Sequence, residues 1–100
     1  PLEQFTSDLL RIIGRYIDLN THRVFFFGSR VSGKGDDRSD IDIGIEGPAP
    51  ISWEAWLRIT EEVDNQPWLY TVDLVHFKKV SEKFKRVALQ KIEPIAYKKS

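Results

Sequence analysis

The sequence predicts a small α/β (α+β) domain in which three strands pack against helices. Three observations support this fold class. Apolar residues recur at helical spacing in three segments, short apolar or alternating runs lie between them, and the order is helix, strand, strand, helix, strand, helix. We find no repeat, linker or low-complexity tract, and a chain of 100 residues suits one domain spanning residues 1–100.

The first helix is expected over residues 2–19, with Ser7 or Thr6 as N-cap and Asn20 near the stop. Its apolar positions have helical spacing: Phe5, Leu9, Ile12, Ile13, Tyr16 and Ile17. Residues 24–27 form a continuous apolar run that ends at Gly28, which predicts a strand buried on both faces. Residues 31–38 show no periodicity and carry two glycines, so we expect a flexible loop there.

The second strand is expected over residues 39–46, where apolar and polar residues alternate until the segment 47–50 ends it. Ser52 then caps a helix that runs to about residue 65. Its apolar face is Trp53, Trp56, Leu57, Ile59 and Val63. Residues 70–77 form the third strand. Ser81 starts the last helix, and Pro94 marks its end. Its inward positions are Phe84, Val87, Ala88 and Ile92.

Composition narrows the class of protein. Fifteen basic residues balance fifteen acidic ones, so no overall field favours nucleic acid, and any such binding would need a local patch. The absence of cysteine excludes disulfides, thiolate zinc sites and cysteine nucleophiles. No apolar run is long enough to span a bilayer, so we expect no membrane contact and a cytoplasmic location. Because the chain opens with proline, we expect its start to be trimmed.

Three aspartates carry most of the functional information. Asp40 and Asp42 lie two residues apart on a predicted strand, so both side chains face the same way. Asp73 interrupts the apolar run of the third strand. Aspartate is depleted in strands and costly to bury without a partner, which indicates a cation between these carboxylates. Hard oxygen ligands suit Mg²⁺ or Mn²⁺. The alternative is a hydrated edge strand with its isoleucines buried.

A Gly-Ser pair directly follows the first predicted strand. Gly28 and Ser29 can expose backbone N–H groups to a phosphate, often at the start of a helix. Arg30 would then clamp the phosphate. The alternative for the pair is an ordinary turn that ends the strand, with a solvated arginine.

The full pattern resembles the nucleotidyltransferase superfamily typified by DNA polymerase beta. Gly28 and Ser29 are followed by ten residues, 30–39, and then by Asp40-Ile41-Asp42, with Asp73 on a later strand. The string with Gly33, Ser39 and Ile43 is similar to the minimal nucleotidyltransferases of bacteria and archaea. The resemblance covers most of the chain and implies a mixed sheet of three to four strands packed against helices.

The resemblance also implies residue roles. Gly28, Ser29, Arg30 and Ser39 would bind the triphosphate of a nucleotide, with ATP as the expected substrate. Asp40, Asp42 and Asp73 would ligate two divalent ions, Mg²⁺ or Mn²⁺, and Asp73 would help activate the attacking hydroxyl. The expected reaction is transfer of a nucleoside monophosphate, AMP in the first instance, to an acceptor hydroxyl.

Minimal nucleotidyltransferases are typically paired with an all-helical HEPN-type protein encoded next to them. The resemblance therefore implies an antitoxin that adenylylates a HEPN-type toxin, in a homo- or hetero-oligomer. Two other functions stay open. One is a binding module that neutralises its partner by contact, which exposed tryptophans on the second helix would favour. The other is a small nucleotidyltransferase acting on RNA or an antibiotic, against which the neutral charge and the lack of an acceptor domain count.

Other polar and aromatic residues give weaker signals. We expect His22 and His76 to be surface or satisfied histidines, with His76 close enough to Asp73 to line an edge of the site. Tryptophans at helical spacing are more often core or interface than base-stacking residues. The lysines and arginines that follow residue 77 form a basic end, either solvated or in contact with RNA or an acidic partner.

Overall fold

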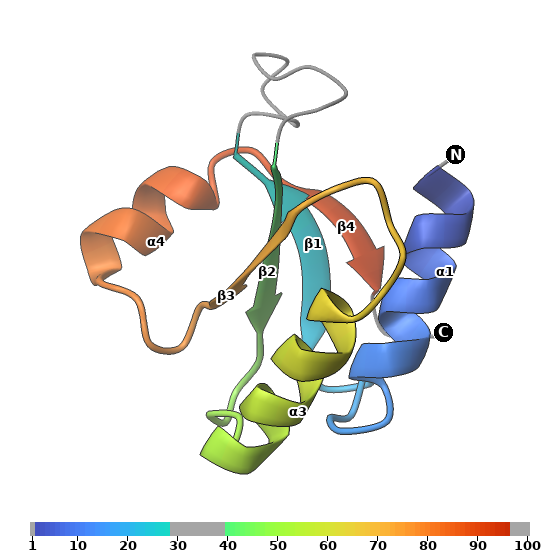
Figure 1. Ribbon diagram of the computed structural model, residues 1–100. Coiled ribbons are helices and arrows are strands. Elements are labelled where there is room, and N and C mark those ends of the chain that lie inside the picture. Colours follow the sequence, from blue (N-terminus) through green and yellow to red (C-terminus); the bar gives the residue numbers. More distant parts are fainter. Residues whose placement is uncertain (1, 29–39, 97–100) are drawn as a thin grey trace.

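The computed structural model describes residues 2–28 and 40–96, arranged as a four-stranded sheet covered by helices (Figure 1). The loop predicted over residues 31–38 lies outside the described residues. The strands are β1 (Arg23–Phe27), β2 (Ile41–Glu46), β3 (Val72–His76) and β4 (Glu93–Ala96). They lie in the order β3-β2-β1-β4. The predicted α/β fold with a mixed sheet of three to four strands is confirmed.

The sheet is mixed because the central strand pair is antiparallel while β3 runs parallel to β2. Strand β1 pairs antiparallel with both β2 and β4. Strand β4 was not predicted as an element, because Pro94 was interpreted only as the end of a helix. Proline lacks an N–H donor, and a strand at the sheet edge tolerates it because one of its sides forms no ladder. β4 is such an edge strand.

Helix α1 (Leu2–Ile13) ends six residues earlier than predicted. At its end Gly14 N–H still bonds to the Leu10 carbonyl, four residues back. The N–H groups of Arg15 and Tyr16 then bond to carbonyls only three residues back, so the chain winds into a tighter turn. Tyr16 and the residues after it nevertheless pack against the core, which explains why the apolar spacing continued past the helix. The predicted N-cap was also wrong, since Thr6 lies inside the helix and its hydroxyl donates to the Glu3 carbonyl.

The two later helices begin where their serines predict. In α3 (Trp53–Asp64), Ser52 Oγ accepts a bond from Ala55 N–H at 3.1 Å. In α4 (Glu82–Ala88), Ser81 Oγ accepts from Phe84 N–H, also at 3.1 Å. Each serine satisfies an N–H group that the first turn leaves without a helical partner. Helix α4 ends at Ala88, well before Pro94.

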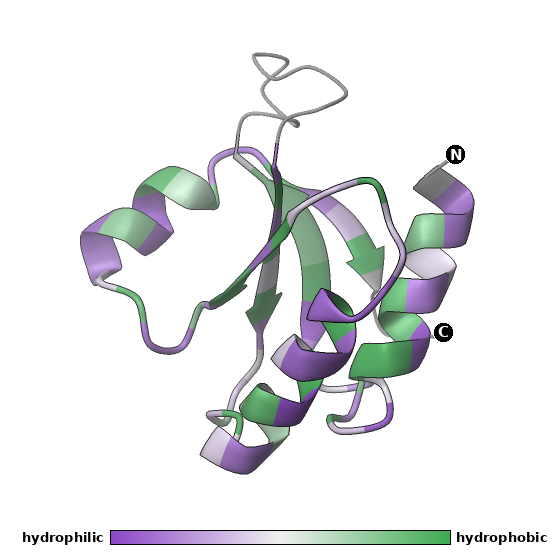
Figure 2. Cartoon of the chain, viewed as in Figure 1, coloured by the Kyte–Doolittle hydropathy of each residue, from purple (hydrophilic) through white to green (hydrophobic). Residues whose placement is uncertain are grey.

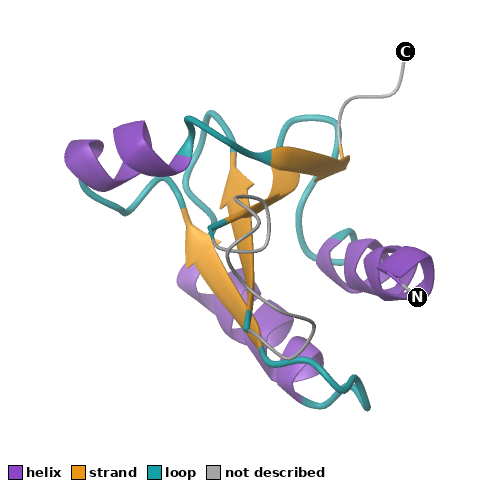
Figure 3. Cartoon of the chain, turned by 90° about the horizontal axis from the view of Figure 1, so that it is seen from above, coloured by secondary structure: helices purple, strands orange, loops and turns teal. Residues whose placement is uncertain are grey.

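Two hydrophobic clusters lie on opposite faces of the sheet. Helices α1 and α3 cover one face with Leu9 and Ile59, which pack with Phe26 and Ile43 of the strands. Helix α4 lies on the other side (Figure 3). There a smaller aromatic cluster forms from Phe25, Phe27 and Phe77. Figure 2 shows the strands as mostly apolar and the helices as two-sided. All four apolar residues of β1 are buried, as predicted for a strand covered on both faces.

Gly44 in β2 makes room for the aromatic cluster. A Cβ at this position would lie 2.4 Å from Cε1 of the Phe25 ring and 2.6 Å from Cε1 of Phe77. The two rings meet edge-on, with centroids 5.0 Å apart. Since side chains alternate along a strand, Asp42 and Glu46 lie on this same face of β2.

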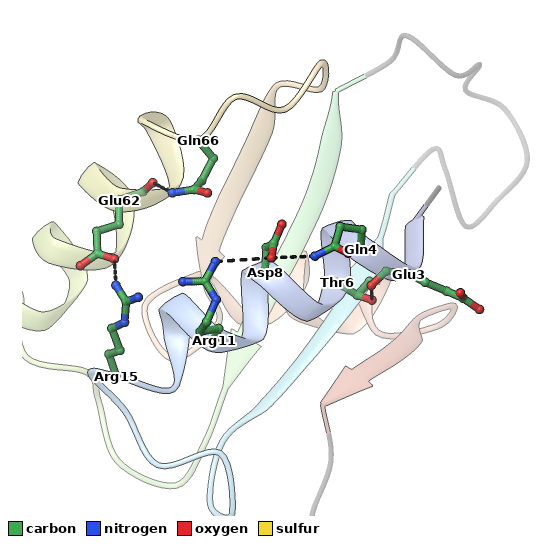
Figure 4. A network of polar contacts seen from close by, with 8 residues as sticks. All are labelled: Glu3, Gln4, Thr6, Asp8, Arg11, Arg15, Glu62 and Gln66. Atoms are coloured by element: carbon green, nitrogen blue, oxygen red, sulfur yellow. Dashed lines mark hydrogen bonds and ion pairs between the residues drawn. The ribbon is translucent and has the colours of Figure 1, made fainter.

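Polar contacts join the end of α1 to α3 (Figure 4). Arg15 Nη1 lies 2.5 Å from Glu62 Oε1, and the Tyr16 hydroxyl donates to the other oxygen of Glu62. This hydrogen bond, with burial and the charge of Glu62, raises the pKa of Tyr16. In the described part of the chain, no helix is both long and apolar enough to cross a membrane.

Candidate active site

The end of β1 and the starts of β2 and β3 lie together at one end of the sheet. Because β1 and β2 are antiparallel, the last residue of β1 lies beside the start of β2, where Phe27 pairs with Asp42. Because β2 and β3 are parallel, the starts of both strands lie at that same end, where Asp42 pairs with Asp73. The topology therefore brings together residues that are 31 positions apart in the sequence.

Gly28 turns the chain at the end of β1 directly against Asp42. Its φ angle is 81°, in the left-handed region that glycine adopts at low cost. A Cβ on Gly28 would lie 2.3 Å from Asp42 Oδ2, so any side chain would displace the carboxylate. Two properties of glycine are therefore needed here, its conformational freedom and its lack of a side chain.

The Asp42 carboxylate lies in an electrostatically unfavourable place. Burial raises its pKa, and the negative charges of Asp73 and Asp40 raise it further. In residues 2–28 and 40–96, no lysine or arginine forms an ion pair with it. A half-buried carboxylate flanked by like charges favours either a proton or a cation.

Asp40 and Asp73 are exposed beside Asp42. Over the described ranges, no group of three acidic or histidine side chains is close enough to form a complete set of metal ligands. Asp42 and Asp73 are thus a registered pair. Asp40 directly precedes β2 and does not lie within it as predicted, but it is close enough for its charge to raise the pKa of Asp42. Like charges repel, and bound divalent cations would offset that repulsion. The donor set, carboxylate oxygen alone, fits Mg²⁺ or Mn²⁺.

The sequence predicted seven site residues, and four of them are described. These four lie together at the end of β1 and the starts of β2 and β3: Gly28, Asp40, Asp42 and Asp73. The remaining three, Ser29, Arg30 and Ser39, lie outside the described residues. The structure thus describes all three aspartates, but of the residues predicted to bind phosphate it describes only Gly28.

Comparison with known proteins identifies the family. The model of the family "Polymerase beta, Nucleotidyltransferase" matches residues 13–100. The chain belongs to this nucleotidyltransferase family. A curated relative, "Probable protein adenylyltransferase MntA" of Haemophilus influenzae, is 33% identical over 66 residues. That segment is 66% of this chain and 58% of the relative, so the chain matches little more than half of that protein's length.

Solved structures share the nucleotidyltransferase fold. One, described as a toxin–antitoxin with AMP-PNP, has a TM-score of 0.65 at 18% identity and is matched over 94% of this chain and 74% of its own. A mutant of the MntA–HpeT toxin–antitoxin gives 0.71 at 14% identity, with the same coverages. A tri-AMPylated HEPN toxin of Shewanella oneidensis with its MNT antitoxin gives 0.62 at 16%, over 95% and 71%. At these identities the likeness shows the fold.

A cavity of about 360 Å³ lies next to Gly28, between the end of β1 and α4. It is lined by Phe27, Gly28, Phe84, Val87, Ala88, Gln90 and Lys91. This cavity was not predicted, because Phe84 and Val87 were both assigned to the inward face of the last helix. The Phe84 ring does pack beside Phe27 and Phe77, but it is 42% exposed, and Val87 is 61% exposed. Helix α4 is only seven residues long and covers the aromatic cluster incompletely, so part of its apolar face borders a cavity.

His76 does not line the site. It pairs in register with Ile45, three positions from the aspartate pair and on the opposite face of the sheet. Its Nε2 accepts a bond from Ile51 N–H at 3.3 Å, and its ring stacks on Trp56 at 5.1 Å. The expectation of a satisfied histidine is confirmed. The expectation that it borders the site was wrong, since an odd separation along a strand reverses the direction of the side chain.

Glu46, the last residue of β2, lies on the same face of that strand as Asp42 and contacts α4. Glu46 Oε1 accepts bonds from Arg23 Nε at 2.9 Å and Nη2 at 2.6 Å. Its other oxygen lies 3.3 Å from Lys85 Nζ of α4. Burial raises the pKa of Glu46, but the hydrogen bonds and charges of Arg23 and Lys85 outweigh it, and the pKa is lowered overall. This cluster ties the helix beside the cavity to the sheet that carries Asp42.

Proposed function

We propose that this protein is a metal-dependent nucleotidyltransferase that transfers AMP from ATP to a hydroxyl group of a HEPN-type helical protein, acting as its antitoxin. The observation that carries the proposal is the registered pair of Asp42 and Asp73, closed on one side by Gly28. Carboxylates are seldom gathered at a strand end without a cation, and family membership gives such a cluster a known type of chemistry.

The comparisons support the choice of nucleotide and partner. The curated relative is named a probable protein adenylyltransferase. Among the structures of the same fold, one is described with the ATP analogue AMP-PNP and another with an AMPylated HEPN toxin bound to an MNT antitoxin. A HEPN-type protein is therefore the first acceptor to test.

The residues of this chain have separate tasks in the proposed reaction. Asp40, Asp42 and Asp73 would hold two divalent ions, which neutralise charge on the phosphates during an in-line displacement. Gly28 lets the backbone approach the polyphosphate closely. The acceptor oxygen forms a bond to the α-phosphorus while the bond from that phosphorus to the bridging oxygen breaks. Pyrophosphate leaves, and Asp73, exposed at the start of β3, receives the proton of the acceptor hydroxyl.

This function is tested with ATP that carries the label on its α-phosphate. The measured quantity is the transfer of label to the purified HEPN-type protein expected to be encoded next to this one. With Mg²⁺ present, we expect labelling by the wild type and a loss of at least about 100-fold for Asp42→Asn, which keeps the shape but removes the charge. Asp8→Asn, a substitution of an acidic residue on α1, is the matched control and should label at the wild-type rate. Equal labelling by Asp42→Asn would exclude the proposed role of the aspartates.

One observation favours a second candidate function, inhibition of the partner by contact. Trp53 at the start of α3 is 70% exposed, and Leu57 on the next turn is 39% exposed. Exposed aromatic and aliphatic side chains on one helix are typical of protein interfaces. Under this function Asp42→Asn would still neutralise the toxin fully, whereas Trp53→Ala with Leu57→Ala would not. The adenylyltransferase function predicts that Asp42→Asn fails to neutralise it.

A further inference from the structure

The cavity beside Gly28 is the strongest feature that the proposed chemistry leaves unused. Its volume of about 360 Å³ lies within the range of small-molecule sites, about 300–1,000 Å³. Gly28 borders it on one side and contacts Asp42 on the other. A nucleotide with its phosphates at the aspartates would therefore have a hollow immediately next to it, on the face of the sheet that carries α4.

The lining of this cavity suits a flat aromatic group. The Phe84 ring packs edge-on against Phe27, with centroids 6.2 Å apart, and part of its surface stays exposed. Val87, one turn further along α4, supplies apolar surface. Aromatic and aliphatic side chains of this kind provide stacking surfaces for nucleic-acid bases.

Two polar side chains that follow α4 in the sequence complete the lining. Gln90 is exposed, and none of the hydrogen bonds among the described residues engages its side-chain amide. An amide offers one donor group and one acceptor, which matches the N6 amino group and N7 of adenine. On the same edge guanine presents two acceptors, O6 and N7, so an amide that faces this edge leaves its own oxygen unpaired. Lys91 also lines the cavity and gives it a positive charge.

We infer that this cavity binds the base of the nucleotide and that Gln90 makes it selective for adenine over guanine. The inference rests on the proposed function, because it places the phosphates at Gly28 and the aspartates. Continuity through Gly28 is what favours the base over other apolar occupants, such as a side chain of the acceptor protein.

Calorimetric titration of the full chain with Mg²⁺-ATP, Mg²⁺-GTP and Mg²⁺-tripolyphosphate tests the inference. Val87→Trp fills the cavity from an exposed position and should weaken ATP binding by about tenfold, with tripolyphosphate binding unchanged. Gln90→Ala should reduce the preference for ATP over GTP by about tenfold. Lys83→Ala, on α4 but outside the cavity lining, is the control and should bind all three ligands as the wild type does.

Circular dichroism and thermal unfolding of each variant verify that the fold is kept, and Gln90, an exposed side chain, is the safer position in this respect. If Val87→Trp and Gln90→Ala both bound Mg²⁺-ATP as the wild type does, the inferred base site would be wrong, and the proposed function would not be affected. A loss of labelling of the acceptor by Val87→Trp, at unchanged ATP affinity, would assign the cavity to the acceptor and overturn the base site as well. If the wild type bound neither nucleotide, the proposed function itself would fail.

Discussion

At the scale of single residues, the contact between Gly28 and Asp42 determines the geometry of the site. One carboxylate oxygen occupies the space where any other residue would place its Cβ. The pair also explains why Gly28 and Asp42, which are separated in the sequence, form one local structure. Neither residue would reveal this alone, since glycine ends many strands and a single aspartate is common on surfaces.

Gly28→Ala is predicted to damage the site more than the fold. The left-handed φ of 81° costs a non-glycine residue about 1–2 kcal/mol, and the new methyl group would push Asp42 aside. We expect a modest fall in the midpoint of urea unfolding and a loss of at least about tenfold in Mg²⁺-ATP affinity by calorimetry. Wild-type affinity in this variant would show that the position of Asp42 does not depend on Gly28.

His76 should make the stability of the protein depend on pH near neutrality. Burial lowers its pKa from 6.5, and the charges of Lys79 and His22 lower it further. The unfolded chain therefore binds a proton more readily than the folded one, so stability is complete above about pH 6.5 and falls as the pH drops toward the folded pKa. Protonation would also remove the acceptor for Ile51 N–H.

Urea unfolding of His76→Gln at about pH 7.5 and about pH 5.5 measures this effect, because glutamine keeps an acceptor but does not titrate. We expect the wild type to lose more stability than the variant between the two pH values. His22→Gln is the control and should keep most of the wild-type pH dependence, because the burial of His76, the largest cause of its lowered pKa, is unchanged. A wild-type stability that stays constant over this interval would contradict the assignment.

At the scale of elements, α4 is a short helix attached by a small ionic cluster. Glu46 joins β2 to β1 through Arg23 and to α4 through Lys85. Only seven residues long, the helix has little packing of its own, and two of its large apolar side chains are exposed. Attachment of α4 thus depends on Glu46 and on the few side chains that reach the aromatic cluster.

Glu46→Gln is predicted to lower the free energy of unfolding by about 1 kcal/mol at neutral pH, in the range of partly exposed ion pairs. Since the pKa of Glu46 is lowered below 4.5, its stabilisation is present above that value and is lost as the pH falls through the folded pKa. The difference between variant and wild type should therefore vanish in acid. Glu61→Gln, an exposed position on α3, should show no difference at either pH.

The sequence predicted an element well where the residue that gave the prediction also takes part in the structure. Ser52 and Ser81 bond to N–H groups of the helices that they start, so their positions were correct. Apolar spacing was a poorer guide to length, because Tyr16 packs on the core from a turn as a helical residue would. Apolar spacing also misassigned Val87, which is 61% exposed, since spacing identifies an apolar face but not what covers it.

At the scale of the whole molecule, the order and direction of the strands create the site. The spacing of Asp40 and Asp42 predicted a shared face from alternation alone. That Asp73 lies beside Asp42 depends on the parallel pairing of β2 with β3, a long-range feature that local patterns do not specify. The cavity at α4 depends likewise on tertiary packing. Residue types therefore predicted the family of the chain, and the surroundings of the aspartates could not be predicted from them.

The central claim is that the three aspartates form a divalent-cation centre for the nucleotide. Its most direct test is calorimetry of Mg²⁺-ATP binding to the wild type and to Asp40→Asn/Asp42→Asn, with Asp8→Asn as the matched acidic control. The account predicts an affinity at least about tenfold lower for the double variant and unchanged for the control. Equal affinity for the wild type and the double variant would contradict it.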